Sequence, residues 1–200
     1  MKIGIFGGSF DPIHNGHMVL AEYVKEGAGL DRIILLPAYE SPFKVGMSGA
    51  DSLQRLRMTE LAAEDNPDLT VSPLDVRQGK VSYTVDLLRV MQKQFPEDRL
   101  YFIAGTDSFL GIERWMGAEE LLTTYGFAVG TRPGYRDEEL TAHAQRLREK
   151  YGAEIIVTSI PKVDISSTDI RRRCSSGGSI RYLVPAEVEE YIRRHRIYEK

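Results

Sequence analysis

The chain has 200 residues, of which 42% are apolar and 28% charged, and its formal net charge is −3. This length can bury the core of one sizeable α/β domain, and the charge argues against a surface devoted to nucleic acid. Cys174 is the only cysteine and cannot form an internal disulfide, no stretch approaches the roughly 18 apolar residues of a membrane span, and the first apolar run stops at Gly7, unlike a signal peptide. We therefore expect a cytoplasmic protein with neither a nucleic-acid nor a membrane partner.

Strand-like and helix-like segments alternate along most of the chain. Short runs rich in β-branched and aromatic residues predict strands at 3–6, 32–37, 69–72, 100–104, 126–130 and 154–158. Amphipathic patterns between them predict helices around 18–26, 52–64, 84–94, 118–123 and 138–151. Buried strands that alternate with helices are typical of a parallel sheet covered on both faces. The fold class is therefore α/β, a Rossmann-like doubly wound parallel sheet.

The alternation stops after Pro161. A polar segment follows, then a loop at Ser175–Ser179 and a final helical stretch over 185–195. We expect a single domain over residues 1–200, in which residues 161–200 form a helical C-terminal extension.

The first motif, GGSFDPIHNGH, begins at Gly7 where the first predicted strand ends. Glycines let a ligand approach the backbone, and a helix that starts near Asn15 would direct N–H groups toward an anion. The spacing matches neither the dinucleotide fingerprint nor the Walker loop. His14 and His17 could ligate zinc, but only two other histidines exist and no cysteine is near. From the residues alone, a phosphate cradle and a plain turn at Asp11-Pro12 both stay open.

The second motif is ISSTDIR, Ile165 to Arg171. Ser166, with Asp169 three residues later, predicts a capped helix start. A serine-rich helix N-terminus with Arg171 one turn inside would also bind a polyphosphate. The run Arg171-Arg172-Arg173 could suggest RNA binding, but such a run is more often a solvated face or a phosphate contact in an acidic chain.

Together these motifs resemble the nucleotidyltransferase superfamily that carries an HxGH motif. The resemblance implies that both histidines contact nucleotide phosphates and that ISSTDIR binds the ATP phosphates from the opposite side. The implied ATP-binding residues are Gly7, Gly8, Ser9, Phe10, His14, His17, Lys44, Gly105, Ile165, Ser166, Ser167 and Arg171.

Further elements resemble the bacterial nicotinate mononucleotide adenylyltransferase family: VSYTVDLL from Val81, GTDSF from Gly105, Trp115, and RPGY from Arg132. The resemblance implies a mononucleotide pocket, with Trp115 stacked on the pyridine ring. Its residues would be Ser9, Thr84, Asp107, Trp115 and Arg132. The chain departs from the family pattern at Ser41, Phe43 and Met116, which leaves the ligand contacts of these three positions undefined.

The implied reaction joins nicotinate mononucleotide to the α-phosphate of ATP and releases pyrophosphate, with Mg²⁺ as cofactor. His14, His17, Lys44 and Arg171 would be the catalytic residues, and Mg²⁺ would bind through the ATP phosphates with no side-chain ligands. The alternatives are a nicotinamide-preferring enzyme, a phosphopantetheine adenylyltransferase, and a nucleotide-sensing module without activity. A homodimer is compatible with the sequence, which fixes neither the oligomeric state nor whether the 40–50 loop closes over ATP.

Overall fold

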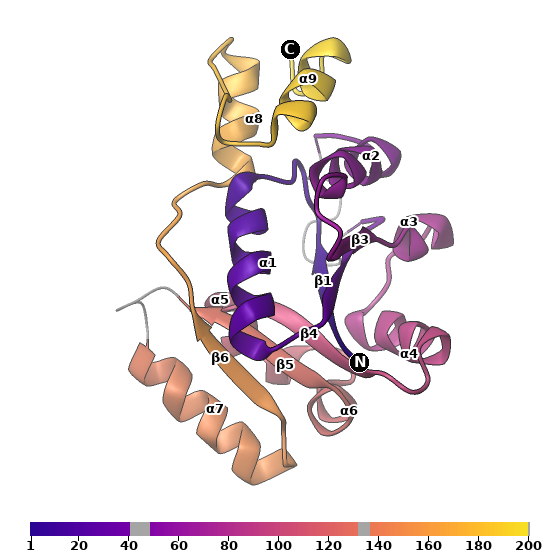
Figure 1. Cartoon of the computed structure of the whole chain (residues 1–200), viewed down its shortest axis with the longest axis vertical. Helices are drawn as coiled ribbons and strands as arrows, with labels where there is room; N and C mark the ends of the chain where they lie inside the picture. The colour runs from indigo at the N-terminus through magenta and orange to yellow at the C-terminus, as the bar shows by residue number, and fades with distance from the viewer. Residues whose placement is uncertain (41–48, 132–136, 200) are drawn as a thin grey trace. The chain divides into compact units, whose positions relative to one another are not determined.

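The computed structural model describes residues 1–40, 49–131 and 137–199 (Figure 1). Its strands are β1 (Lys2–Gly8), β2 (Arg32–Pro37), β3 (Leu69–Val71), β4 (Arg99–Gly105), β5 (Gly126–Thr131) and β6 (Ile155–Ser159). Its helices are α1 (Asn15–Ala28), α2 (Ser52–Ala63), α3 (Leu74–Gln78), α4 (Thr84–Gln94), α5 (Thr106–Leu110), the 3-10 helix η1 (Ile112–Arg114), α6 (Ala118–Thr124), α7 (Asp137–Tyr151), α8 (Ser167–Ser175) and α9 (Ala186–Arg194).

The strands form one sheet of order β3-β2-β1-β4-β5-β6. The pairings of β1 with β4, β4 with β5 and β5 with β6 are all parallel. The strand order reverses at β1 and β4, which is the arrangement of a doubly wound Rossmann-like sheet. This confirms the predicted fold class. The GGSFDPIHNGH motif begins with the last two residues of β1, and the GTDSF motif begins with the last residue of β4, so each motif starts at the carboxyl end of a strand.

Contacts group the chain into two compact units. Unit 1 comprises residues 1–6, 20–34 and 83–162, and unit 2 comprises residues 7–19, 35–82 and 163–200. The single domain expected from the sequence stays a prediction.

In unit 1, helices cover both faces of β5. On one face, a Cβ on Gly130 would lie 3.2 Å from Leu20 Cδ1 of α1, so this glycine lets α1 pack closely on the strand. On the other face, the rings of Phe127 and Phe109 of α5 have centroids 5.7 Å apart. Helix α7 lies beside β6 (Figure 1). Phe109 and Phe127 are fully buried, so this aromatic pair lies in the core of the unit.

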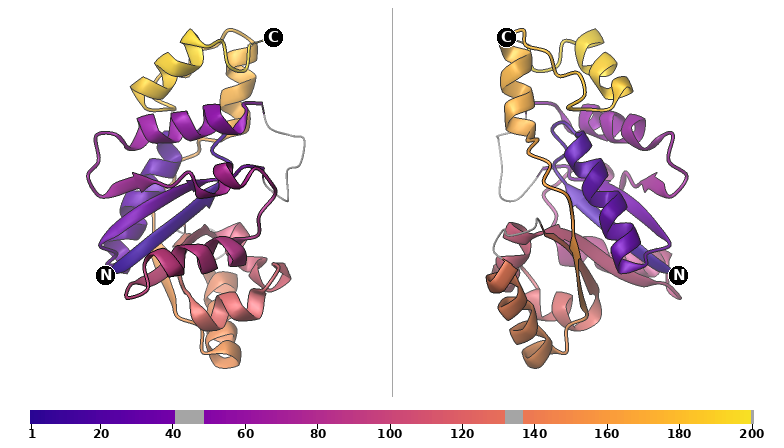
Figure 2. Two further views of the ribbon diagram at one scale, coloured as in Figure 1. Left: turned by 90° about the vertical axis from the view of Figure 1, so that its right-hand side faces the viewer. Right: turned by 60° about the vertical axis from the view of Figure 1, so that its left-hand side comes forward.

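In unit 2, the C-terminal extension consists of α8 and α9. Figure 2 shows α9 lying against α2, a packing that the contacts between these helices also record. The buried face of α9 carries Val188 and Ile192, while the rest of the helix is polar, as in an amphipathic surface helix. None of the helices in the described residues is long and apolar enough to cross a membrane.

Candidate functional site

The loop after β1 is shaped by a close contact between Gly8 and Phe10. Phe10 has a φ of 47°, in the left-handed region, and is almost fully buried. A Cβ on Gly8 would lie 2.9 Å from Phe10 Cε1, so only glycine fits there. The Phe10 ring then meets the edge of the His17 ring, with centroids 5.1 Å apart. The second glycine of the motif therefore lets an aromatic side chain support one of the histidines.

His14 and His17 form a stacked pair. Their ring centroids lie 3.6 Å apart with planes inclined by 21°, and the backbone N–H of His14 donates to His17 Nδ1 over 3.2 Å. Because Nδ1 accepts, a neutral His17 carries its proton on Nε2. Burial lowers the pKa of His14 to about 4, so this imidazole is neutral near pH 7.

Gly16 lies against the first histidine. A Cβ at this position would be 3.0 Å from His14 Nδ1 and 3.1 Å from His14 Cε1. His14 Nδ1 is buried and has no hydrogen-bond partner among the described residues. The glycine between the histidines therefore leaves space at the edge of the His14 ring.

Unit 2 brings the second motif onto the first. Ser167 Oγ donates to the carbonyl oxygen of Pro12 over 3.0 Å, and Arg171 Nη1 donates to that of Asp11 over 2.7 Å. Helix α8 starts as the sequence predicts, because the Ser166 side chain caps it by accepting from the N–H of Asp169. The two bonds thus join residues that are 155 and 160 positions apart in the chain.

The start of α1 offers fewer open N–H groups than the sequence suggested. The N–H of Asn15 donates to Leu183 O over 2.9 Å, and the N–H of His17 donates to His14 O over 2.8 Å. These two groups are already engaged with the protein. The amide Nδ2 of Asn15 also donates to Tyr182 O, so the entry to α1 is fixed by the C-terminal extension. Binding of an anion here would depend more on side-chain donors than on the helix end.

Asp11 is a buried, hydrogen-bonded residue of the loop that the sequence predicted only to form a turn. Its side chain is buried at 4% exposure, and its carboxylate accepts hydrogen bonds from the N–H groups of Gly49 and Ala50 and from the hydroxyl of Tyr198. Its partners come from two parts of the chain that are 38 or more residues away from it, so no local spacing could have identified it.

Arg55 of α2 is a second buried residue of this region that the sequence did not predict. It is 2% exposed, and its guanidinium donates to the carbonyl oxygens of Ser9, Ala38, Tyr39 and Ala50. Burial lowers the pKa of Arg55. The nearby Asp11 carboxylate opposes this effect more than any other charge does. One signal was present: Arg55 lies three and four residues before Met58 and Thr59 on the buried face of the helix.

Unit 1 holds Thr84, Asp107 and Trp115 of the predicted mononucleotide pocket and Gly105 of the predicted ATP site, while Ser9 lies in unit 2. Thr84 is the first residue of α4, Gly105 ends β4, and Asp107 lies exposed in the first turn of α5. The half-buried Trp115 ring meets the edge of Phe102, with centroids 5.7 Å apart. Met116, where the family pattern is broken, is 58% exposed. Lys44 and Arg132, like Ser41 and Phe43, lie outside the described residues.

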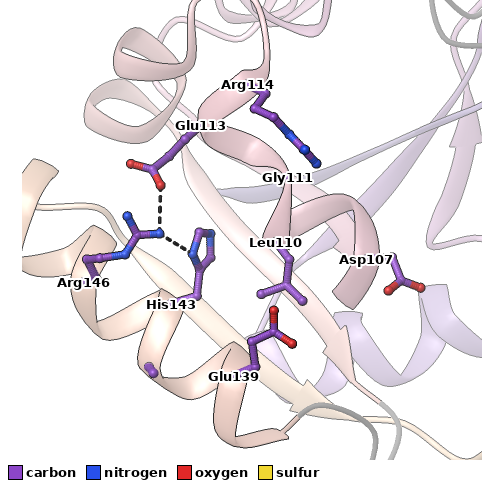
Figure 3. A pocket seen from close by; sticks show the side chains of 9 residues that line it. Asp107, Leu110, Gly111, Glu113, Arg114, Glu139, His143 and Arg146 are labelled. Atoms are coloured by element: carbon purple, nitrogen blue, oxygen red, sulfur yellow. Dashed lines mark hydrogen bonds and ion pairs between the residues drawn. The ribbon is translucent and has the colours of Figure 1, made fainter.

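Asp107 lines a pocket of about 690 Å³ between α5 and α7 (Figure 3). Arg146 bridges two other lining residues, reaching Glu113 Oε2 over 2.8 Å and His143 Nδ1 over 2.7 Å. Burial, helped by Arg146, lowers the pKa of His143. Glu113, His143 and Arg146 of this pocket wall are therefore held by interactions with one another.

Comparison with known proteins identifies the family. Residues 5–173 match the cytidylyltransferase-like family. A probable nicotinate-nucleotide adenylyltransferase of Thermoanaerobacter sp. is 40% identical over 100% of this chain and 95% of its own length. A probable nicotinate-nucleotide adenylyltransferase of Thermus thermophilus is also 40% identical, over 99% of this chain and 100% of its own length.

A solved structure agrees in fold. The Plasmodium falciparum nicotinic acid mononucleotide adenylyltransferase complexed with NaAD superposes with a TM-score of 0.79 at 21% identity, over 98% of this chain and 97% of its own. The strand order described above and these similarities along the full length lead to one assignment. The chain belongs to the cytidylyltransferase-like family and, within it, to the nicotinate-nucleotide adenylyltransferases.

Proposed function

We propose that this chain transfers the adenylyl group of ATP to nicotinate mononucleotide, forming nicotinate adenine dinucleotide and releasing pyrophosphate. The observation that carries the proposal is the hydrogen bonding of the ISSTDIR motif to the GGSFDPIHNGH loop through Ser167 and Arg171. It brings phosphate-binding donors from both motifs into one unit. The names of the relatives that match the chain along its full length support the choice of acceptor.

The chemistry requires no nucleophile from the protein. The 5′-phosphate of the mononucleotide attacks the α-phosphorus of ATP, the bond from that phosphorus to the bridging oxygen of the β-phosphate breaks, and pyrophosphate carries away the electron pair. The attacking phosphate is already anionic, so no general base is needed. The protein is left to position the two phosphates and to stabilise the charge on the leaving group.

Three side chains of unit 2 suit this task. His17 Nδ1 accepts from the backbone N–H of His14, so in the neutral ring Nε2 carries the proton that would be donated to a phosphate. His14 is kept neutral by burial and can donate a hydrogen bond without a positive charge. Arg171 supplies a permanent positive charge and a planar set of donors that matches phosphate oxygens. The resemblance to the family adds Lys44 as a fourth group.

Mg²⁺ enters the proposal as part of the ATP substrate, because this ion is normally held by nucleotide phosphates and water. The donor set of the loop is consistent with that. The Asp11 carboxylate already accepts three hydrogen bonds, and the groups assigned to ATP are nitrogen donors that bind phosphate rather than a cation.

The acceptor would be bound through the residues that the resemblance implies, which include Ser9. Trp115 presents a half-buried ring for stacking on the electron-poor pyridine, while Thr84 and Asp107 supply polar groups at the first turns of α4 and α5. Arg132 is proposed from the resemblance. Cytoplasmic location and homodimer formation stay predictions from the sequence.

The test is pyrophosphate release from ATP and Mg²⁺ with three acceptors in parallel: nicotinate mononucleotide, nicotinamide mononucleotide and phosphopantetheine. We expect the highest kcat/KM with nicotinate mononucleotide and no pyrophosphate release with phosphopantetheine. Equal rates with both mononucleotides would contradict the preference for the acid. Activity with phosphopantetheine alone would overturn the assigned substrate, and the absence of activity with all three would favour a nucleotide-sensing module.

A further inference from the structure

The carboxylate of Asp11 joins the first motif to the C-terminal tail. Oδ1 accepts from the Tyr198 hydroxyl over 2.7 Å and from the N–H of Ala50 over 3.1 Å, and Oδ2 accepts from the N–H of Gly49 over 2.8 Å. A buried carboxylate needs such donors because it has lost its water. Tyr198 is the only one of the three donors that comes from a side chain.

The tail adopts an unusual backbone to place this hydroxyl. Arg196 and Tyr198 have φ values of 51° and 68°, in the left-handed region that non-glycine residues rarely occupy. Ile197 between them is buried at 4% exposure. Burial and the neighbouring Asp11 carboxylate both raise the pKa of Tyr198, so the hydroxyl keeps its proton. A strained local conformation held in this way points to a role for the side chain that it places.

Tyr198 and Arg171 pack on the same glycine. A Cβ on Gly49 would lie 2.8 Å from Tyr198 Cδ1 and 3.1 Å from Arg171 Cδ. The Arg171 guanidinium lies beside the same aspartate, with Nη1 2.7 Å from the Asp11 carbonyl oxygen and 3.7 Å from Oδ2. The position of Arg171 is therefore set by Gly49 and Asp11, and Tyr198 contacts both of them.

We propose that Tyr198 is a positioning residue for Arg171. By occupying Oδ1, its hydroxyl holds the Asp11 carboxylate in an orientation in which Arg171 is bound mainly through the Asp11 backbone carbonyl. Without that donor, the carboxylate turns toward the guanidinium and competes with the ATP phosphates for it. This inference rests on the proposed function, in which Arg171 binds ATP.

The experiment removes one oxygen atom. Tyr198→Phe keeps the ring on Gly49 and deletes only the hydroxyl. We expect the KM for ATP to rise about five- to twentyfold, while the KM for nicotinate mononucleotide changes less than about twofold. Tyr182→Phe is the matched control, because Tyr182 is also in unit 2 and has a φ of 66° but is 83% exposed. It should leave both constants unchanged.

A double-mutant cycle separates positioning from general support of the fold. In an Arg171→Ala background, Tyr198→Phe should change the KM for ATP by less than about twofold, because the residue it positions is gone. The proposal is overturned if Tyr198→Phe raises this KM by the same factor in both backgrounds, or if the single variant behaves like the wild type.

A second variant covers the case in which Tyr198→Phe fails to fold. Gly49→Ala would push on both Tyr198 and Arg171 and should also raise the KM for ATP selectively, while an unchanged KM would contradict the proposal. The arginine side-chain NMR signal of Arg171, compared between the wild type and Tyr198→Phe without substrates, gives a readout independent of activity. A shift supports positioning and an unchanged signal contradicts it, even if the wild type proves inactive and the proposed function fails.

Discussion

The imidazole rings of His14 and His17 are stacked, with centroids 3.6 Å apart, and the backbone N–H of His14 binds the ring nitrogen of His17. The two histidines are thus one unit and not two independent side chains. His14 is buried, and its neutral ring supports His17, which is more exposed to solvent. The expected effects of pH and of substitution on the pair follow from this difference.

The first prediction is that acid destabilises the protein through His14. The pKa of His14 is lowered to about 4 in the folded protein from 6.5. Between these values the unfolded chain binds more protons, so stability falls as the pH drops below 6.5 and is not affected above it. From about pH 6.5 to about pH 5 the loss should be about 2 kcal/mol of the free energy of unfolding.

Urea unfolding at a series of pH values measures this loss. His14→Gln, which cannot titrate, is the reference variant, and the pH dependence of the wild type relative to it isolates the histidine. Parallel pH profiles for the two proteins would show that His14 is not the group responsible.

The second prediction concerns catalysis by His17. Removing a donor that stabilises the developing charge typically costs about 2–4 kcal/mol in the transition state, so His17→Ala should lower kcat by a factor of roughly 30 to 1000. Steady-state kinetics of pyrophosphate release measures it. His195→Ala, at an exposed histidine, should retain wild-type kcat. A His17→Ala variant with normal turnover would remove His17 from the mechanism.

The third prediction is that Gly16→Ala impairs activity more than stability. Gly16 does not have a positive φ, so alanine is compatible with its backbone. Its Cβ, however, would press on the His14 ring at 3.0 Å and shift the stacked pair. We expect kcat/KM for ATP to fall roughly ten- to a hundredfold, since small displacements of positioned groups are costly.

Gly178→Ala is the control for this substitution, because its new Cβ would meet neighbours no nearer than 3.4 Å. Measuring both kcat/KM and the thermal unfolding midpoint of each variant separates the effect on activity from the effect on stability. A Gly16→Ala protein with an unchanged kcat/KM would show that the His14 ring does not need this space.

The sequence predicted the sheet well because its strands are continuous apolar runs. The predicted strand 32–37 coincides with β2, and the other strands agree to within one or two residues of their ends. Helices α3 and α5 were not predicted, since each has only five residues and a segment that short shows no helical periodicity. The two motifs were found for a different reason, because each is a local pattern that resembles a family.

The supporting network around the motifs could not be predicted. Arg55 binds backbone carbonyl groups of Ser9, Ala38, Tyr39 and Ala50, and backbone acceptors leave no trace in residue types. Asp11 receives two backbone N–H groups and a tyrosine 187 residues away. Such contacts exist only after the chain has folded, so spacing along the sequence does not encode them.

The fourth prediction tests that network through Arg55. Arg55→Met fills similar space but leaves the carbonyl oxygens without their buried donor, and an unsatisfied buried acceptor is costly. We expect the free energy of unfolding to fall by about 3 kcal/mol or more. Arg57→Met in the same helix removes only an exposed ion pair with Glu60. It should change the free energy of unfolding by less than about 1 kcal/mol. Equal losses for both variants would contradict the assigned role of Arg55.

The fifth prediction uses Trp115, the only tryptophan in the chain. All tryptophan fluorescence therefore reports on one ring, which is half-buried beside Phe102. If the pyridine of nicotinate mononucleotide stacks on it, adding the mononucleotide without ATP should quench the emission in a saturable way. Adding ATP alone should change it little, because the residues proposed for the ATP phosphates belong to the other motifs.

Substitution of the ring turns this optical signal into an energetic test. Aromatic stacking contributes roughly 0.5–1.5 kcal/mol, so Trp115→Leu should raise the KM for nicotinate mononucleotide about two- to tenfold while leaving the KM for ATP near its wild-type value. The selectivity is the informative part, because a general loss of folding would affect both substrates together. If the KM for ATP rises as much as that for the mononucleotide, Trp115 supports the core around Phe102 rather than the acceptor.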